Sequence, residues 1–370
     1  MPDQRFENIL VVRLDNVGDV VMLTPALRAL RLAYPAARIT LLCSPAGARV
    51  TPMLPSVDDV IVRRAPWQAL SGAIDFSPAS ELAFIKTLAE HRFDAAFIFT
   101  SFSQSPFPPA FACYLAGIPR RFGESKEFGG AILTDVAPPL PGQAHQVDRN
   151  LHLLAFAGLP LVGTHMELAI SAQAETRAMA LLRAHEIDPA SPYVVVAPGA
   201  SCDARRYDPG RLAEAVRLLA RQAAAPAVVV GVPADRPAAD LIVDAVGPGA
   251  AVSLAGETSV PGLAAIIRAA ALVVTNNSAP LHIADAFRRP VVALYSGTEY
   301  EEQWRARHSP SVLLRRPTAC SPCFAFTCPH NKECLDIAPA DVARAALSLL
   351  PTHLSVPTQS PHSGEELVIR

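Results

Sequence analysis

Short runs of apolar, mostly β-branched residues alternate with longer segments of helical period along most of this chain. In the first half these runs lie at residues 9–14, 38–43, 59–62 and 95–99. In the second half they lie at residues 193–197, 227–230, 252–254, 272–275 and 291–295. Segments rich in Ala, Leu and Arg separate the runs and predict helices at residues 25–33, 80–91, 151–158, 209–224, 260–270 and 279–287. The alternation predicts parallel sheets with crossover helices, so the expected fold class is α/β.

The two sets of predicted strands are separated by residues 159–192, which are marked by proline at both ends and contain a helical stretch at 175–185. We therefore predict two Rossmann-like, doubly wound domains, an N-terminal one over residues 1–165 and a C-terminal one over residues 166–350. Residues 351–370 are rich in Pro, Ser and Thr and are predicted to be a disordered tail. Doubly wound sheets bind ligands at the carboxyl ends of their strands, so we expect the active site in a cleft between the domains.

The charge balance argues against a nucleic-acid-binding protein. The chain carries 32 Lys and Arg against 34 Asp and Glu, a formal net charge of −2, whereas nucleic-acid binders usually have a basic excess. The longest weakly charged run, residues 95–119, is interrupted by prolines and does not read as a transmembrane helix. The first residues include Asp3 and Glu7, unlike a signal peptide. The sequence predicts a cytoplasmic protein.

The first candidate for chemistry follows the predicted strand at 9–14, where Gly18 and Asp19 lie in a turn before a helix. A carboxylate at that place can accept the proton of an attacking hydroxyl group, as a general base does. The alternative is that Asp15 or Asp19 only caps the helix. A single glycine does not make the dinucleotide-binding fingerprint.

A second candidate follows the strand at 193–197. Gly199 and Ser201 form a turn of small residues, and Arg205 and Arg206 come directly after it. Backbone amides together with guanidinium groups suit a diphosphate. The alternative is a solvated pair of arginines on a loop.

A third candidate follows the strand at 272–275, where a polar turn opens a helix. It consists of Asn277, Ser278, Ala279, Pro280, Leu281 and His282. The free amides at a helix start, together with the Asn277 and Ser278 side chains, predict a second phosphate-binding turn. His282 is expected to face the same opening, either as a site residue or as a structural hydrogen-bonding group.

Taken together, these three stretches resemble glycosyltransferase family 9, the ADP-heptose:lipopolysaccharide heptosyltransferases, over residues 8–345. The matching motifs are Gly18-Asp19 followed by Thr24-Pro25-Ala26-Leu27, then Pro198-Gly199-Ala200-Ser201 with Arg205 and Tyr207, then the loop at 277–282. The resemblance implies a GT-B fold with the acceptor in the N-terminal domain and the donor in the C-terminal domain. It also implies an inverting transfer of heptose or a related sugar from an ADP-sugar, without a catalytic cofactor.

The resemblance also assigns roles to individual residues. Asp19 matches the family's catalytic base, Arg205 matches a lysine that contacts the donor phosphates, and the loop at 277–282 matches the ADP-binding loop. Asp235 falls where the family often has a glutamate near the adenosine ribose.

Three departures from the family pattern concern the donor: Asn277 replaces an aspartate, Ala279 replaces a glycine and Arg205 replaces the lysine. They leave two alternatives open. One is a GT-B transferase or epimerase that uses a different nucleotide sugar, and the other is a non-catalytic protein that binds sugar nucleotides.

Four of the seven cysteines lie within fifteen residues near the end of the C-terminal half: Cys320, Cys323, Cys328 and Cys334. In a cytoplasmic protein such a cluster favours a structural Zn or Fe site over disulfides. The alternative is a set of reduced, packed thiols.

A saccharide or glycolipid acceptor that carries negative charge would need cationic partners in the N-terminal half. The candidates are Arg63, Arg120, Arg121 and His145, with ordinary surface charges as the alternative.

The uncharged segment 101–111 carries Phe102, Phe107 and Phe111 after a predicted strand end. These rings suit peripheral contact with the inner face of the cytoplasmic membrane. The alternative is that they pack under the domain.

Overall fold

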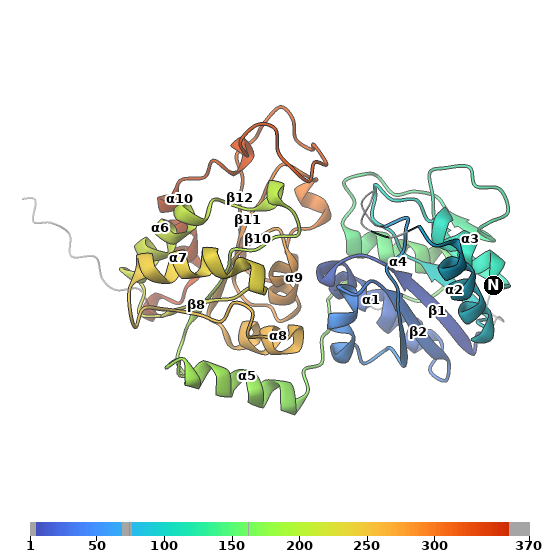
Figure 1. Cartoon of the computed structure of the whole chain (residues 1–370), viewed down its shortest axis with the longest axis horizontal. Helices are drawn as coiled ribbons and strands as arrows, with labels where there is room; N and C mark the ends of the chain where they lie inside the picture. The colour runs from blue at the N-terminus through green and yellow to red at the C-terminus, as the bar shows by residue number, and fades with distance from the viewer. Residues whose placement is uncertain (1–4, 69–73, 75, 162, 355–370) are drawn as a thin grey trace, which may run out of the picture.

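The computed structural model describes residues 5–68, 74, 76–161 and 163–354, and these residues contain two six-stranded, wholly parallel sheets. Figure 1 shows the two sheets side by side, with α1 (Val17–Ala33) of the first domain facing α9 (Ala279–Ala286) of the second at the junction. The predicted α/β class is confirmed.

The N-terminal sheet has the strand order β3-β2-β1-β4-β5-β6. Its strands are β1 (Asn8–Arg13), β2 (Arg38–Cys43), β3 (Asp59–Val62), β4 (Ala95–Ile98), β5 (Arg120–Glu124) and β6 (Asp135–Ala137). Besides α1, its helices are the 3₁₀ helix η1 (Gly47–Met53), α2 (Pro78–Glu90), α3 (Phe107–Leu115) and α4 (Gln146–Phe156).

The C-terminal sheet has the order β12-β11-β10-β7-β8-β9. Its strands are β7 (Val194–Ala197), β8 (Ala227–Val229), β9 (Ala251–Ser253), β10 (Leu272–Asn276), β11 (Val291–Leu294) and β12 (Ser311–Leu314). Its other α-helices are α5 (Ala172–Ala184), α6 (Pro209–Ala220), α7 (Arg236–Val246), α8 (Val260–Ala269) and α10 (Pro339–Leu349). Short 3₁₀ helices are η2 (Asp203–Arg205), η3 (Pro233–Asp235), η4 (Glu301–Gln303), η5 (Glu333–Leu335) and η6 (Thr352–Leu354).

Strand β1 illustrates why its sequence is an uninterrupted apolar run. Ile9 and Val11 belong to the core beneath α1 and α4, whereas Leu10 and Val12 belong to the core on the opposite face, with residues of α2 and α3. Because helices cover both faces of a parallel sheet, the four central positions of the strand, residues 9–12, are all apolar, and polar side chains stand only at its two ends. The first of these cores continues across the junction into α8 and α9, so the two domains pack against each other.

Each sheet has one point at which the strand order reverses direction, between β1 and β4 in the first and between β7 and β10 in the second. Loops that leave the carboxyl ends of these strands diverge and make room for ligands. The three stretches singled out in the sequence follow β1, β7 and β10, so all three lie at these reversal points.

Helix α1 begins at Val17 and not at Pro25, where the sequence predicted it. Asn16 and Asp19 form a capping box that starts the helix two turns earlier. Pro25 then falls inside the helix and cannot donate a hydrogen bond to the carbonyl oxygen of Val21. The Thr24 hydroxyl donates to that oxygen instead, at 2.8 Å, which explains why the proline is tolerated.

Helix α4 packs on α1 of the first domain, whereas the next helix, α5, packs on α8 of the second. The chain therefore passes from one domain to the other between α4 and α5.

The start of the predicted tail differs from the expectation, because residues 352–354 form η6 and Leu354 is buried. Residues 355–370 lie outside the described residues. In the described part of the chain, no helix is both long and apolar enough to cross a membrane.

Candidate active site

Helices α1 and α9 pack closely against each other at Gly18. A methyl group in place of its hydrogen would lie 2.6 Å from Cδ2 of His282 and 3.7 Å from the Cα atom of Ala279. The absence of a side chain at Gly18 therefore lets the two helix starts meet. This contact brings Asp19, on the first turn of α1, beside the predicted donor loop.

Asp19 is held by groups of its own domain. Its Oδ2 accepts a hydrogen bond from the backbone of Asn16 at 3.0 Å, and its Oδ1 accepts one from Nη2 of Arg13 at 2.9 Å. Arg13 is the last residue of β1 and is fully buried, and its Nη2 also donates to Ser101 at 2.9 Å. The capping role of Asp19 is thus real, and the same carboxylate still has 14% of its side chain exposed at the junction.

Asp15 occupies the other side of the Arg13 guanidinium. Its Oδ2 lies 3.0 Å from Nε of Arg13, and its Oδ1 accepts from Gln104 at 2.5 Å. Burial raises the pKa of Asp15, while the positive charge of Arg13 acts to lower it. The Asp15 side chain is 10% exposed and that of Asp19 is 14% exposed, so position on the first turn of α1, next to Gly18, distinguishes Asp19 from Asp15 more than burial does.

Arg205 lies on η2, after the turn that follows β7. Its Nε donates to Thr298 at 3.2 Å, its Nη1 donates to Ser201 at 3.3 Å, and its Nη2 lies 2.7 Å from Oε1 of Glu299. Glu299 follows β11 and also accepts a hydrogen bond from Nδ2 of Asn277 at 3.4 Å. The predicted turns after β7 and β10 therefore meet around one guanidinium group.

Asn276, at the end of β10, ties these two turns together. Its Nδ2 donates to the carbonyl oxygen of Pro198 at 2.7 Å, and its Oδ1 accepts from the backbone of Tyr207 at 3.1 Å. The Ser278 hydroxyl lies 3.1 Å from that of Thr275. Leu281 is buried in the core, so only its backbone belongs to the helix start.

His282 is 5% exposed and packs edge-on against Trp304. Burial lowers its pKa to about 4, although the carboxylates of Asp19 and Asp285 act in the opposite direction. At neutral pH the imidazole is uncharged, so His282 can contribute a hydrogen bond or a contact surface but not a positive charge.

Asp235 has a structural setting that the sequence did not indicate. Its Oδ2 accepts from the backbone of Val232 at 3.0 Å, which caps η3. A methyl group on Gly199 would lie 2.5 Å from Oδ2 of Asp235, and one on Gly231 would lie 2.8 Å from its Cβ. Both glycines therefore make room for this carboxylate, at the carboxyl ends of β7 and β8.

The cations predicted to contact the acceptor are all engaged within the protein. Arg121 is buried and donates to backbone carbonyls of residues 118, 119, 131 and 132, and Arg120 pairs with Asp135 at 2.7 Å. Both lie at the amino end of β5, whereas Asp19 follows the carboxyl end of β1 at the opposite end of the sheet. Arg63 pairs with Glu81.

His145 caps α4 through Nδ1, and its Nε2 contacts the carbonyl oxygen of Arg305 in the second domain at 3.0 Å. Burial lowers its pKa to about 4, so it is uncharged at neutral pH. Both ring nitrogens are occupied, and the structure gives His145 a place in the domain junction and not on an open acceptor surface.

The four clustered cysteines lie in one loop beside the donor turns. Cys328 Sγ accepts hydrogen bonds from the backbone amides of His330 and Lys332, each at 3.4 Å. The backbone of Cys323 donates to the carbonyl oxygen of Gly297 at 3.0 Å. Among the described residues, however, no three His, Cys, Asp or Glu side chains are arranged so that they could hold a metal ion.

The three phenylalanines of segment 101–111 have different surroundings. Phe102 contacts the cations of Lys126 and Arg149, and Phe107 packs against the core. These contacts agree with the packed alternative. Phe111 is 49% exposed and stacks on Tyr114 on the outer face of α3.

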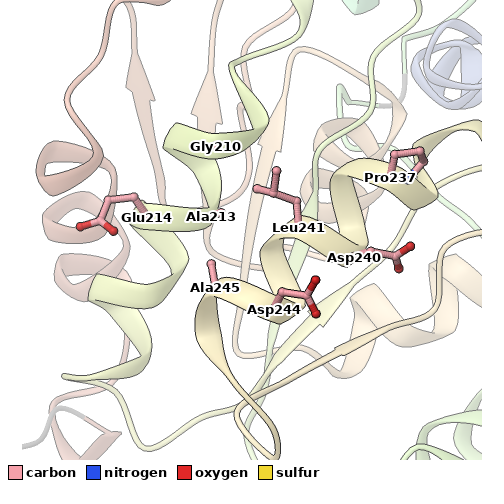
Figure 2. Close-up of a pocket in the computed structure, with 8 residues that line it drawn as sticks. All are labelled: Gly210, Ala213, Glu214, Pro237, Asp240, Leu241, Asp244 and Ala245. Carbon is pink, nitrogen blue, oxygen red and sulfur yellow. The ribbon is translucent and has the colours of Figure 1, made fainter.

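Two hollows in the described part of the chain differ in position. A groove of about 610 Å³ lies between α6 and α7 (Figure 2), on the side of the second domain away from α1 (Figure 1). A pocket of only about 20 Å³ lies at the carboxyl ends of β4 and β5, lined by Ser101, Lys126 and Arg149 among others. The small pocket is the one next to Asp19, because Ser101 and Asp19 share Arg13.

Sequence reasoning missed the two residues that organise the site's charges, Arg13 and Glu299. Arg13 ends an apolar run, and a buried cation at that point is itself a signal, because it needs an anionic partner. Glu299 stands in a segment with other acidic residues, and nothing local distinguishes it from Glu301 or Glu302.

Comparisons with known proteins agree with this architecture. The family model of glycosyltransferase family 9 (heptosyltransferase) matches residues 81–333. Lipopolysaccharide heptosyltransferase 2 of Escherichia coli K12 is 28% identical over 307 residues, which cover 78% of this chain and 82% of that protein.

Two solved structures share the fold. The E. coli ADP-heptose lipopolysaccharide heptosyltransferase II has a TM-score of 0.72 at 24% identity and covers 92% of this chain and 98% of its own. The glycosyltransferase family 9 protein of Veillonella parvula has a TM-score of 0.75 at 19% identity and covers 94% and 98%. The expected GT-B arrangement of two sheets is confirmed.

Proposed function

The chain belongs to glycosyltransferase family 9, and on this basis we propose that it is an inverting transferase of heptose, or a related sugar, from an ADP-sugar. The proposed acceptor is a saccharide or glycolipid of the lipopolysaccharide-core kind. One observation carries the proposal: Gly18, the neighbour of Asp19 in α1, meets His282 of the second domain, and the charge of Asp19 acts on His282 and on Glu299, the partner of Arg205.

The reaction divides between the two domains. An acceptor hydroxyl on the side of the N-terminal sheet attacks the anomeric carbon of the donor, and Asp19 takes its proton. The bond between that carbon and the diphosphate oxygen breaks, and ADP leaves with the electron pair. Arg205 and the amino end of α9 stabilise the negative charge that develops on the leaving group.

Arg13 serves as a positioning residue for this base. Its guanidinium holds Oδ1 of Asp19, while the Asn16 amide holds Oδ2, so the carboxylate is fixed before the acceptor arrives. A base fixed in advance does not have to be ordered during the reaction. The small pocket beside Ser101, with Lys126 and Arg149, is the proposed place for an anionic group of the acceptor.

Replacing Asp19 tests whether it acts as the catalytic base or serves only in structure and binding. We expect Asp19→Asn to lower ADP release from ADP-heptose, in the presence of acceptor, by roughly 10²- to 10⁴-fold, the usual contribution of a positioned base. The affinity for ADP and the melting temperature should change little, because the asparagine oxygen can still cap α1. Steady-state kinetics and thermal unfolding measure both effects.

Asp15→Asn is the matched control, because it changes the other carboxylate on Arg13 and should keep most of the turnover. Turnover in Asp19→Asn close to that of the wild type would make Asp19 a helix cap only. A wild-type protein that binds ADP-heptose without releasing ADP would favour the non-catalytic alternative.

For the cysteine loop we propose a structural Zn or Fe ion, bound by Cys320, Cys323, Cys328 and Cys334. Two features support it. The first is that two amides donate to Cys328 Sγ, which suits a thiolate, and the second is that the other three thiols are near enough to Cys334 to raise its pKa together with burial, so without an ion Cys334 stays protonated. An ion would allow these thiols to ionise together. Its role would be to hold the loop against the donor turns, and no catalytic step needs it.

Elemental analysis tests the metal. We expect about one Zn or Fe per chain, as a tetrathiolate site holds, and we expect Cys323→Ser to lose both the metal and thermal stability. Cys202→Ser, outside the loop, should keep both. A metal-free preparation with full activity would leave the packed-thiol alternative.

We also propose a cytoplasmic location with peripheral contact at the inner face of the membrane. The support is the exposed face of α3, where Phe111, Tyr114 and Leu115 are each about half exposed, at 49%, 49% and 48%. Aromatic and apolar side chains on one short helix suit the boundary between head groups and acyl chains.

Liposome binding tests the membrane contact. We expect Phe111→Ser combined with Tyr114→Ser to weaken binding to liposomes that contain lipopolysaccharide, without lowering the melting temperature. Leu241→Ser changes a similarly exposed residue on α7 and should bind as the wild type does. Unchanged binding in the α3 variant would remove the proposal.

A further inference from the structure

The guanidinium group of Arg205 already has an anionic partner in the structure. Its Nη2 lies 2.7 Å from Oε1 of Glu299, while its other nitrogens donate to Thr298 and Ser201. A carboxylate and a phosphate present the same kind of acceptor oxygens to a guanidinium group. Glu299 therefore occupies the position on Arg205 that a phosphate oxygen of the donor would need.

Glu299 is poorly placed to share Arg205 with a second anion. Only 18% of its side chain is exposed, and its Oε2 is held by Asn277 of the donor loop. Burial raises the pKa of Glu299, Arg205 acts to lower it, and the carboxylate of Asp19 raises it again. A diphosphate beside this carboxylate would be repelled at short range, in a partly buried setting where water screens charge weakly.

We propose that Glu299 is an internal competitor of the donor's diphosphate: it pairs with Arg205 when the site is empty and is displaced when an ADP-sugar or ADP binds. The inference rests on the proposed function, because it takes Arg205 as the ligand of the diphosphate. It adds a residue to the donor site that the motifs did not include.

The competition acts at two steps of the catalytic cycle, the binding of the donor and the release of ADP. It weakens binding of the anionic donor, and it gives Arg205 a ready partner when the product ADP departs. Release of product limits turnover in many enzymes. When Glu299 pairs with Arg205 again, it replaces the diphosphate on that cation and so favours the release of ADP. An ion pair inside the site can therefore shorten the residence time of ADP.

Calorimetric titration with ADP tests the competition. Glu299→Gln keeps the shape of the side chain and removes its charge, and we expect it to bind ADP on the order of tenfold more tightly, which is about 1.4 kcal/mol. Glu299→Ala should change affinity in the same direction. Glu302→Gln removes the same charge three residues further on and should stay within about twofold of the wild type, as a generic surface charge would.

A double-mutant cycle identifies the cation involved. In an Arg205→Gln background the gain from Glu299→Gln should largely disappear, because the competition is for that guanidinium group. Product inhibition by ADP should become stronger in Glu299→Gln and should stay unchanged in Glu302→Gln.

Two different failures are distinguishable. If the wild type binds ADP but Glu299→Gln, with an unchanged melting temperature, binds it equally or more weakly, then Glu299 supports Arg205 and the competition is refuted. If the folded wild type binds neither ADP nor ADP-heptose, the assignment of the donor site itself is wrong, and this inference is refuted along with it.

Discussion

The close approach of two helix starts, α1 at Gly18 and α9 at His282, is the contact on which the rest of the site depends. Each helix begins at the reversal point of its own sheet, so each brings the loops of one domain to the junction. Neither domain holds all of the proposed site, because the proposed base lies after β1 and the proposed phosphate-binding turns follow β7 and β10. Glycine at position 18 is required by the packing of the two domains at this point.

Two arginines, the fully buried Arg13 and the partly buried Arg205, hold the carboxylates on the two sides of this contact. Arg13 fixes Asp19 and Asp15 in the first domain, and Arg205 meets Glu299 in the second. Burial raises the pKa of Glu299, and the negative charge of Asp19 across the junction acts in the same direction. A dianionic ligand that enters between Asp19 and Glu299 would change these ion pairs. The pair of Arg205 with Glu299 can open while Arg13 continues to hold the proposed base.

The sequence was sufficient to predict features that neighbouring residues determine. It was not sufficient for features that depend on contacts between distant segments of the chain. Strand β1 could be located because both of its faces are buried, so residues 9–12 form an unbroken apolar run. The start of α1 was misplaced because Pro25 suggested a first turn, whereas the Asn16 capping box lies upstream. Arg121 resembled a surface cation, yet backbone carbonyls from a later loop surround it. Glu299 could not be identified, because only the fold brings it to Arg205.

The central claim is a direct displacement between domains, with Asp19 as the base on one side and the diphosphate held by the C-terminal domain on the other. The most direct measurement is the anomeric configuration of the product, determined by NMR after transfer from an ADP-heptose of known configuration. A single attack on the face opposite the diphosphate predicts that the transferred sugar has the inverted configuration. A product that retains the donor's configuration would contradict the account, because it would require a second nucleophile or a front-face reaction.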